Sequence, residues 1–244
     1  MSERRNPYDQ PIGPAVAGWT ERARPPRRAL KGRYCRLEPV DPQRHADGLF
    51  AAYMEAPDAR DWTYLFSERP ETFTLFHEYL ARLAKSEDPL HYTIMDTEAA
   101  LGTEAAKPAG TAALMRVDPV HGVIEVGSIA YSPRLKRTRA GTEAMYLLMR
   151  LVFDELGYRR YEWKCDSLNG PSRAAAQRYG FTFEGVFRKA VIYKDRSRDT
   201  AWYSIVAEEW PRIRSALEVW LDPENFDAAG RQKRALETLR AAGY

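Results

Sequence analysis

One stretch of the chain decides its fold: Val123-Ile124-Glu125-Val126-Gly127-Ser128-Ile129-Ala130-Tyr131-Ser132-Pro133-Arg134-Leu135-Lys136-Arg137-Thr138-Arg139-Ala140-Gly141-Thr142-Glu143-Ala144. Its first nine residues are rich in β-formers, and a basic loop follows them. From Ala144 to Leu156 apolar residues recur at helical spacing, and Gly157 then ends the predicted helix. The first turn of a helix has free N–H groups and a dipole that favours negative charge. We therefore predict an anion site where the loop meets the helix.

The composition is typical of a globular protein, with 44% hydrophobic and 29% charged residues in 244. No apolar run approaches the ~20 residues of a membrane span, and no apolar segment near Met1 resembles a signal peptide. Cys35 and Cys165 are far apart in the sequence and fit a reducing compartment, so we predict a cytoplasmic protein. The net charge of +3 weakly favours anionic ligands and disfavours a nucleic-acid-binding domain.

Three parts are predicted along the chain: a basic, Pro-containing arm over 1–31, a domain over 32–210 and a helical extension over 211–244. The arm shows no periodicity, and its arginines cluster around Pro25-Pro26. We interpret it as an extended segment that packs loosely or is disordered. A contact with RNA is the alternative, and the absence of aromatic residues between the arginines disfavours it. Whether the extension forms a homodimer is not decided by its sequence.

The order of elements predicts a strand, two helices, an antiparallel meander, the central helix, a strand, a short helix and a hairpin. The predicted strands cover residues 32–40, 90–95, 110–117, 123–131, 160–165, 181–193 and 200–207. The first predicted helix begins at Pro42, and the others cover residues 71–85, 144–156, 169–179, 212–220 and 228–241. Residues 97–107 are predicted to form a loop.

Two further motifs follow the central stretch. They are Asn169-Gly170-Pro171-Ser172 and, eight residues beyond its serine, Gly180-Phe181-Thr182-Phe183-Glu184-Gly185. With Glu125 on its strand and the basic loop, they resemble the GNAT family of acyl-CoA-dependent N-acyltransferases, most closely its RimJ/RimL-like branch. The resemblance covers about residues 33–207. It implies an α/β fold whose mixed, mostly antiparallel sheet is splayed at the centre and flanked by helices. It also implies acetyl transfer from acetyl-CoA to a primary amine, by direct attack in a ternary complex.

The same resemblance implies which residues hold acetyl-CoA. The loop and helix start would receive the pyrophosphate, and the splayed strand and Asn169 would contact the pantetheine arm. The residues concerned are Ile129, Tyr131, Lys136, Arg137, Thr138, Arg139, Ala140, Gly141, Thr142, Asn169 and Ser172. Arg139 occupies the middle glycine position of the family pattern, where glycine lets the backbone approach the phosphates. We interpret it as an added phosphate contact, and weakened CoA binding is the alternative.

The resemblance assigns two catalytic residues. Ser172 matches the serine that protonates the leaving thiolate, and a role in the helix cap is equally compatible with its position. Glu125 matches the general base that works through water, and a structural ion pair is at least as compatible with a strand carboxylate. The glutamate that this branch carries on the long strand falls on Val191, so that assignment does not transfer.

The resemblance also implies a small-molecule or peptide amine as the acceptor, bound by the early helical region. Trp62, Tyr64 and His91 are the candidate substrate-binding residues, although each aromatic residue alone is more typical of a core. No spacing of histidines and cysteines indicates a metal. Arg139 and Val191 also motivate a second hypothesis, a GNAT-like binding or regulatory module with impaired chemistry.

Overall fold

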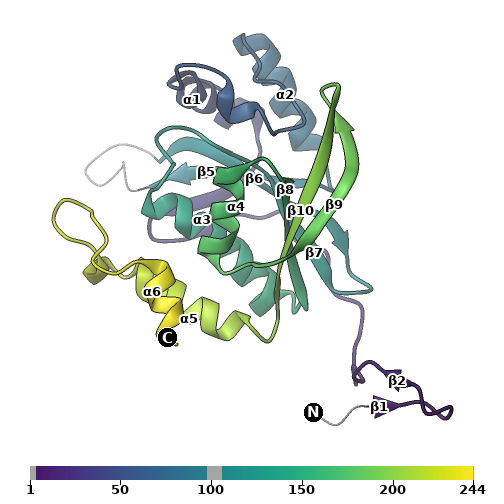
Figure 1. The fold of residues 1–244 in the computed structure, drawn as a ribbon. Helices are drawn as coiled ribbons and strands as arrows, with labels where there is room; N and C mark the ends of the chain where they lie inside the picture. The colour runs from purple at the N-terminus through teal and green to yellow at the C-terminus, as the bar shows by residue number, and fades with distance from the viewer. Residues whose placement is uncertain (1–3, 98–105, 244) are drawn as a thin grey trace.

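The computed structural model describes residues 4–97 and 106–243, and an eight-stranded sheet lies at its centre (Figure 1). The strand order is β3-β4-β5-β6-β7-β8-β10-β9. The strands are β3 (Leu30–Lys31), β4 (Cys35–Pro39), β5 (Leu90–Asp96), β6 (Lys107–Asp118), β7 (Val123–Tyr131), β8 (Arg160–Asp166), β9 (Thr182–Tyr193) and β10 (Arg196–Val206). Among the described strands of this sheet, β7 and β8 run parallel and the other neighbours are antiparallel. The predicted mixed, mostly antiparallel sheet is confirmed.

Helices cover both faces of the sheet (Figure 1). They are α1 (Pro42–Met54), α2 (Phe73–Lys85), α3 (Arg139–Arg150), α4 (Gly170–Tyr179), α5 (Trp210–Leu221) and α6 (Leu236–Ala241). Short turns of helix also form at η1 (Arg60–Trp62), η3 (Leu151–Glu155) and η4 (Pro223–Asn225). The helices α1 and α2 enclose a small aromatic core, whereas α3, α4 and α5 enclose the main core on the opposite face. None of the helices in the described part of the chain combines the length and apolar character that a membrane span requires.

The central helix begins earlier than its apolar periodicity predicts. Thr138 is the N-cap of α3, and its hydroxyl accepts a hydrogen bond from the Gly141 amide at 3.0 Å. A π-helical turn, η3, prolongs α3 to Glu155, and Gly157 follows with φ +66°. The Thr138 hydroxyl satisfies one of the amides that would otherwise be unpaired at the start of a helix. The first turn of α3 can therefore begin directly after the basic loop.

The two parallel strands part halfway along β7. Their pairing runs from Val123 opposite Arg160 to Val126 opposite Trp163, and β7 continues without β8 to Tyr131. Ser128 has φ +49°, and the register of β7 against β6 shifts at this point, which defines a β-bulge. A bulge bends its strand and increases its twist, so the second half of β7 turns away from β8.

Much of the N-terminal arm is fastened to the domain. A hairpin of β1 (Arg4–Arg5) and β2 (Pro11–Ile12) projects from the body of the molecule (Figure 1). Beyond it, the Trp19 indole donates to the Val120 carbonyl at 2.8 Å, and the Tyr158 hydroxyl donates to the Ala23 carbonyl at 3.1 Å. Arg27 donates to the Ala84 carbonyl at 3.1 Å. The division at residue 31 stays a prediction.

The C-terminal extension packs on the main core through α5 and α6. The helix expected over 228–241 is wrong in its first half, because α6 begins only at Leu236. The Asn225 side chain prevents an earlier start. Its amide donates to the carbonyls of Trp220 and Arg234 at 3.1 and 3.2 Å, and its oxygen accepts from the Arg234 amide. These bonds hold the intervening segment as a loop.

Candidate active site

The loop between β7 and α3 is fixed by its own hydrogen bonds. The amides of Leu135 and Lys136 both donate to the Ser132 carbonyl, and the Thr138 hydroxyl donates to the Leu135 carbonyl at 2.8 Å. Gly141 packs so closely that an added Cβ would lie 2.7 Å from the Leu135 carbonyl oxygen and 3.0 Å from the Tyr131 ring. The Tyr131 hydroxyl in turn donates to the Gly141 carbonyl at 2.7 Å. The loop therefore presents the first turn of α3 in one defined position.

Two of the basic loop side chains have acidic partners on the α1 side. The Arg134 Nε lies 2.7 Å from a carboxylate oxygen of Glu55, and the Lys136 Nζ lies 2.5 Å from Asp61. Arg137 is exposed and adopts a left-handed backbone with φ +62°. The positive charge that the sequence concentrates here is thus partly balanced within the protein.

Arg139 lies between two aromatic rings. Its guanidinium carbon is 4.8 Å from the Tyr34 ring and 4.7 Å from the Phe226 ring. Arg178 makes a related bridge, because it donates to the Thr142 hydroxyl at 3.2 Å and lies 4.9 Å from the Trp220 ring. Phe226 and Trp220 belong to the extension, which therefore contacts the start of α3. Sequence reasoning missed these partners, because no local motif connects them to the loop.

Glu125 is buried in an ion-pair network on the last paired rungs of β7 and β8. One of its carboxylate oxygens lies 2.9 Å from Lys164 and 3.4 Å from Arg116. Lys164 also lies 2.6 Å from Glu162 and 3.9 Å from the centre of the Trp202 ring. Burial raises the pKa of Glu125, and Lys164 is the largest influence that opposes this rise.

Ser172 and Asn169 stand at the start of α4. The Asn169 side chain accepts from the Ser172 amide at 3.1 Å, so Asn169 is the N-cap of that helix. The Ser172 hydroxyl accepts a hydrogen bond from the Trp163 indole at 3.0 Å. Because an indole N–H can only donate, the serine keeps its own proton for another acceptor. Burial raises the pKa of the nearby Cys165 thiol, and a hydrogen bond with Ser172 opposes that effect.

The three candidate substrate-binding residues lie in different surroundings. Trp62 is 3% exposed and packs 5.5 Å from the Tyr53 ring, in the small aromatic core. His91 is buried on β5, its Nδ1 has no hydrogen-bond partner among the described residues, and burial lowers its pKa to about 4. The Tyr64 hydroxyl donates to the Leu168 carbonyl at 3.2 Å, just beyond the end of β8. Of the three, Tyr64 is the one that contacts the segment between β8 and α4.

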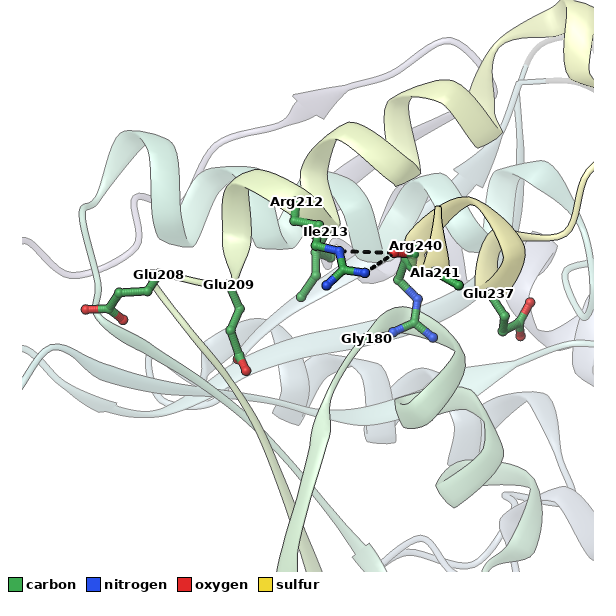
Figure 2. A pocket seen from close by; sticks show the side chains of 8 residues that line it. All are labelled: Gly180, Glu208, Glu209, Arg212, Ile213, Glu237, Arg240 and Ala241. Atoms are coloured by element: carbon green, nitrogen blue, oxygen red, sulfur yellow. Dashed lines mark hydrogen bonds between the residues drawn. The ribbon is translucent and has the colours of Figure 1, made fainter. Parts of the chain in front are cut away.

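A separate hollow lies away from these residues. It measures about 520 Å³ and separates the end of α4 from α5 and α6 (Figure 2). Arg212 spans it and donates to the Arg240 carbonyl at 3.0 Å. Its lining consists of Gly180, Glu208, Glu209, Arg212, Ile213, Glu237, Arg240 and Ala241. None of the predicted site residues lines this hollow, and no group of three potential metal ligands forms within residues 4–97 and 106–243.

The chain is similar to a known protein family and to solved structures. The model of the acetyltransferase (GNAT) domain matches residues 35–182. A GCN5-related N-acetyltransferase from Brucella melitensis is similar in structure, with a TM-score of 0.88 and 49% identity over 93% of this chain and 100% of that chain. A GNAT-family protein from Chromobacterium violaceum has a TM-score of 0.72 and 37% identity, over 84% of this chain and 100% of that one.

A more distant structure shares the fold alone. It is an acetyltransferase from Salmonella typhimurium that modifies the N-terminal serine of a 50S ribosomal subunit protein. Its TM-score is 0.59 at 17% identity, over 73% of this chain and 98% of that chain. No curated protein sequence matches significantly.

Proposed function

This chain belongs to the GNAT family of acetyltransferases, and on that premise we propose that it transfers the acetyl group of acetyl-CoA to a primary amine. The observation that carries the proposal is the end of β7–β8 pairing at Val126 and Trp163, beside the capped start of α3. Where the strands part, backbone groups that no longer pair between β7 and β8 can bind the pantetheine arm of acetyl-CoA. The start of a helix favours binding of the pyrophosphate of acetyl-CoA. The reaction proceeds by direct attack in a ternary complex, without a covalent intermediate on the protein.

The loop supports binding of the donor. Residues 136–142 would hold the pyrophosphate, with Gly141 allowing the tight packing that positions them. Ile129 and Tyr131 lie on the part of β7 that is not paired with β8, where they would flank the pantetheine arm. Asn169 would contact the same arm from the start of α4. Its capping role is compatible with this, because it fixes the helix against which the arm lies.

Two side chains would move protons. The amine nitrogen attacks the thioester carbonyl, a C–N bond forms, and the C–S bond breaks. Glu125 would accept the amine proton through water, and its Lys164 partner would keep it ionised. Ser172 would donate its proton to the departing thiolate, since its oxygen is already engaged by Trp163. A backbone N–H beside the Ser128 bulge, at Ile129, would stabilise the oxyanion.

The acceptor is a small-molecule amine or a protein N-terminus. The distant Salmonella acetyltransferase acts on an N-terminal serine, and the motif from Asn169 to Ser172 supports the RimJ/RimL-like branch. We further propose that the enzyme works in the cytoplasm. We also propose that two copies of the chain form a homodimer through the C-terminal extension.

The proposed activity is tested in two steps. Titration calorimetry with acetyl-CoA should give binding heat, and an amine library should then release free CoA thiol. Ser172→Ala should lower kcat about 100-fold or more, because a general acid typically contributes about 10²–10⁴-fold, and should weaken acetyl-CoA binding far less. Absence of acetyl-CoA binding would refute the proposal. Binding without thiol release from any amine would instead support the binding-module hypothesis.

A further inference from the structure

Arg198 is a buried cation without a carboxylate partner in the described part of the chain. It is 7% exposed and lies on β10, on the same face as Thr200 and Trp202. Its Nε donates to the Thr200 hydroxyl at 3.1 Å, and no Asp or Glu of residues 4–97 and 106–243 lies within ion-pair distance. Arginines are seldom buried unless they are paired, because removing the charge from water is costly. A guanidinium has five N–H donors, and within residues 4–97 and 106–243 one of them is used in a hydrogen bond.

Two aromatic rings orient this guanidinium. The guanidinium carbon lies 5.4 Å from the centre of the Phe66 ring and 5.9 Å from that of the Tyr193 ring, and the two ring centres are 5.5 Å apart. Phe66 is 58% exposed, so solvent reaches this side of the cluster. The nearby carboxylate of Asp166 is engaged elsewhere, since it accepts from the Tyr193 hydroxyl at 2.8 Å and from the Leu168 amide. The rings stabilise the cation without using its N–H groups.

The segments that carry the cluster are tied together. Lys194, in the turn between β9 and β10, donates to the Trp62 carbonyl and pairs with Glu68, both at 2.9 Å. Arg196 donates to the Thr63 carbonyl at 2.7 Å. These bonds fix the hairpin end to the segment that carries Phe66. A donor fork held in this way binds an anion with little further loss of entropy.

The position of Arg198 suits the acceptor rather than the donor. Thr200 pairs with Asp166, the last residue of β8, and Ser172 follows shortly after in α4. Arg198 precedes Thr200 by two residues on β10, which is about 7 Å at the rise of a strand. Because β10 runs antiparallel to β8, Arg198 lies beyond the C-terminal end of β8, and β8 separates β10 from β7 and the loop that follows β7.

We propose that Arg198 binds a carboxylate carried by the amine acceptor, so that the acceptor is an amino acid or a similar small amine with an acidic group. The proposal rests on the proposed acetyl transfer for the amine, and on the buried guanidinium for the carboxylate. A planar arginine fork matches a carboxylate in a bidentate manner, which an amide or an alcohol cannot replace.

The kinetic test uses matched amines in the thiol-release assay. Amino acids, their amides and the corresponding amines without the carboxylate are compared with wild type, Arg198→Gln and Arg198→Lys. The carboxylate form should be preferred about 10- to 100-fold in kcat/KM by wild type, mainly through KM. Arg198→Gln should remove that preference, and Arg198→Lys should restore part of it. Equal use of acid and amide by wild type would overturn the proposal.

A binding test separates this inference from the proposed chemistry. N-acetyl amino acids and their amides are titrated into the CoA-loaded protein by calorimetry, which needs no turnover. The acids should bind to wild type and lose about 10-fold or more in affinity in Arg198→Gln. Arg188→Gln removes an exposed arginine from the neighbouring strand and should change nothing. Melting temperatures confirm that each variant is folded. If the acids bind no better than the amides, the inference fails even when the enzyme acetylates other amines.

Discussion

Lys164 and Glu125 form a buried ion pair across β7 and β8, with 2.9 Å between the ammonium nitrogen and a carboxylate oxygen and both side chains 5% exposed. A general base and a structural ion pair were the two interpretations of Glu125 from the sequence, and this contact makes them compatible. The pair lies where the strands part, and Lys164 supplies the charge that keeps a buried carboxylate ionised.

Lys164→Gln should move the acidic limb of the pH–rate profile. Burial already raises the pKa of Glu125, and loss of the Lys164 cation raises it further. Since a base acts only when it is unprotonated, the limb should shift to higher pH, by about one pH unit.

The Lys164→Gln variant should also lose about 3 kcal/mol of stability, as a protein does when a buried ion pair is broken. Kinetics over pH 5–9 check the first effect and urea unfolding the second. Lys85→Gln, at an exposed site, is the control. An unmoved limb in a folded variant would leave Glu125 with a structural role alone.

Gly141→Ala should destabilise the protein by about 1–3 kcal/mol and weaken acetyl-CoA binding. The new Cβ would lie 2.7 Å from the Leu135 carbonyl oxygen, and backbone cannot give way as a side chain does. Gly170→Ala is the matched control, because nothing lies within 4 Å of a Cβ there. That control should be neutral or slightly stabilising. Thermal unfolding and calorimetry measure both variants. Equal behaviour of the two would show that the loop does not need this close contact.

Arg139→Met should weaken acetyl-CoA binding several-fold and make it less dependent on salt. The substitution keeps the apolar stem but removes a cation from the first turn of α3, where a phosphate would lie. Arg150→Met is the control at the other end of the same helix, where Arg150 lies 5.8 Å from the Tyr146 ring. Dissociation constants for acetyl-CoA, measured at low and high salt, test both effects. Tighter binding by Arg139→Met would favour the alternative, in which Arg139 hinders the approach of phosphate.

His91→Leu should make the protein less sensitive to acid. Burial, with a smaller contribution from Arg27, lowers the pKa of His91 to about 4, below the ordinary 6.5. The unfolded chain therefore binds more protons between these values, and wild type loses stability as the pH falls through this range. At pH 5 the loss amounts to about 2 kcal/mol. Urea unfolding at pH 7.5 and pH 5 should show a smaller difference for the variant. An unchanged difference would mean that His91 is accessible to protons in the folded state.

Local sequence was enough to predict most elements of the fold. Alternation and apolar spacing are properties of neighbouring residues, so the strand at Val123–Tyr131 and the helix ending before Gly157 could be recognised. The predicted starts of two helices were wrong because one side chain overrides such a pattern in each case. The Thr138 cap starts α3 early, and the Asn225 bonds delay α6. The predicted loop over 97–107 lies mostly outside the described residues.

The sequence by itself determined the family, because Asn169, Ser172 and the glycine motif after them stand at a fixed spacing that one stretch of chain contains. Tertiary structure alone decided which charges meet. Arg139 lies between Tyr34 and Phe226, Glu125 pairs with Lys164, and Arg198 is buried without an acidic partner among the described residues. The physical reason is that burial and ion pairing depend on contacts between distant segments, which only the packed sheet and its helices bring together.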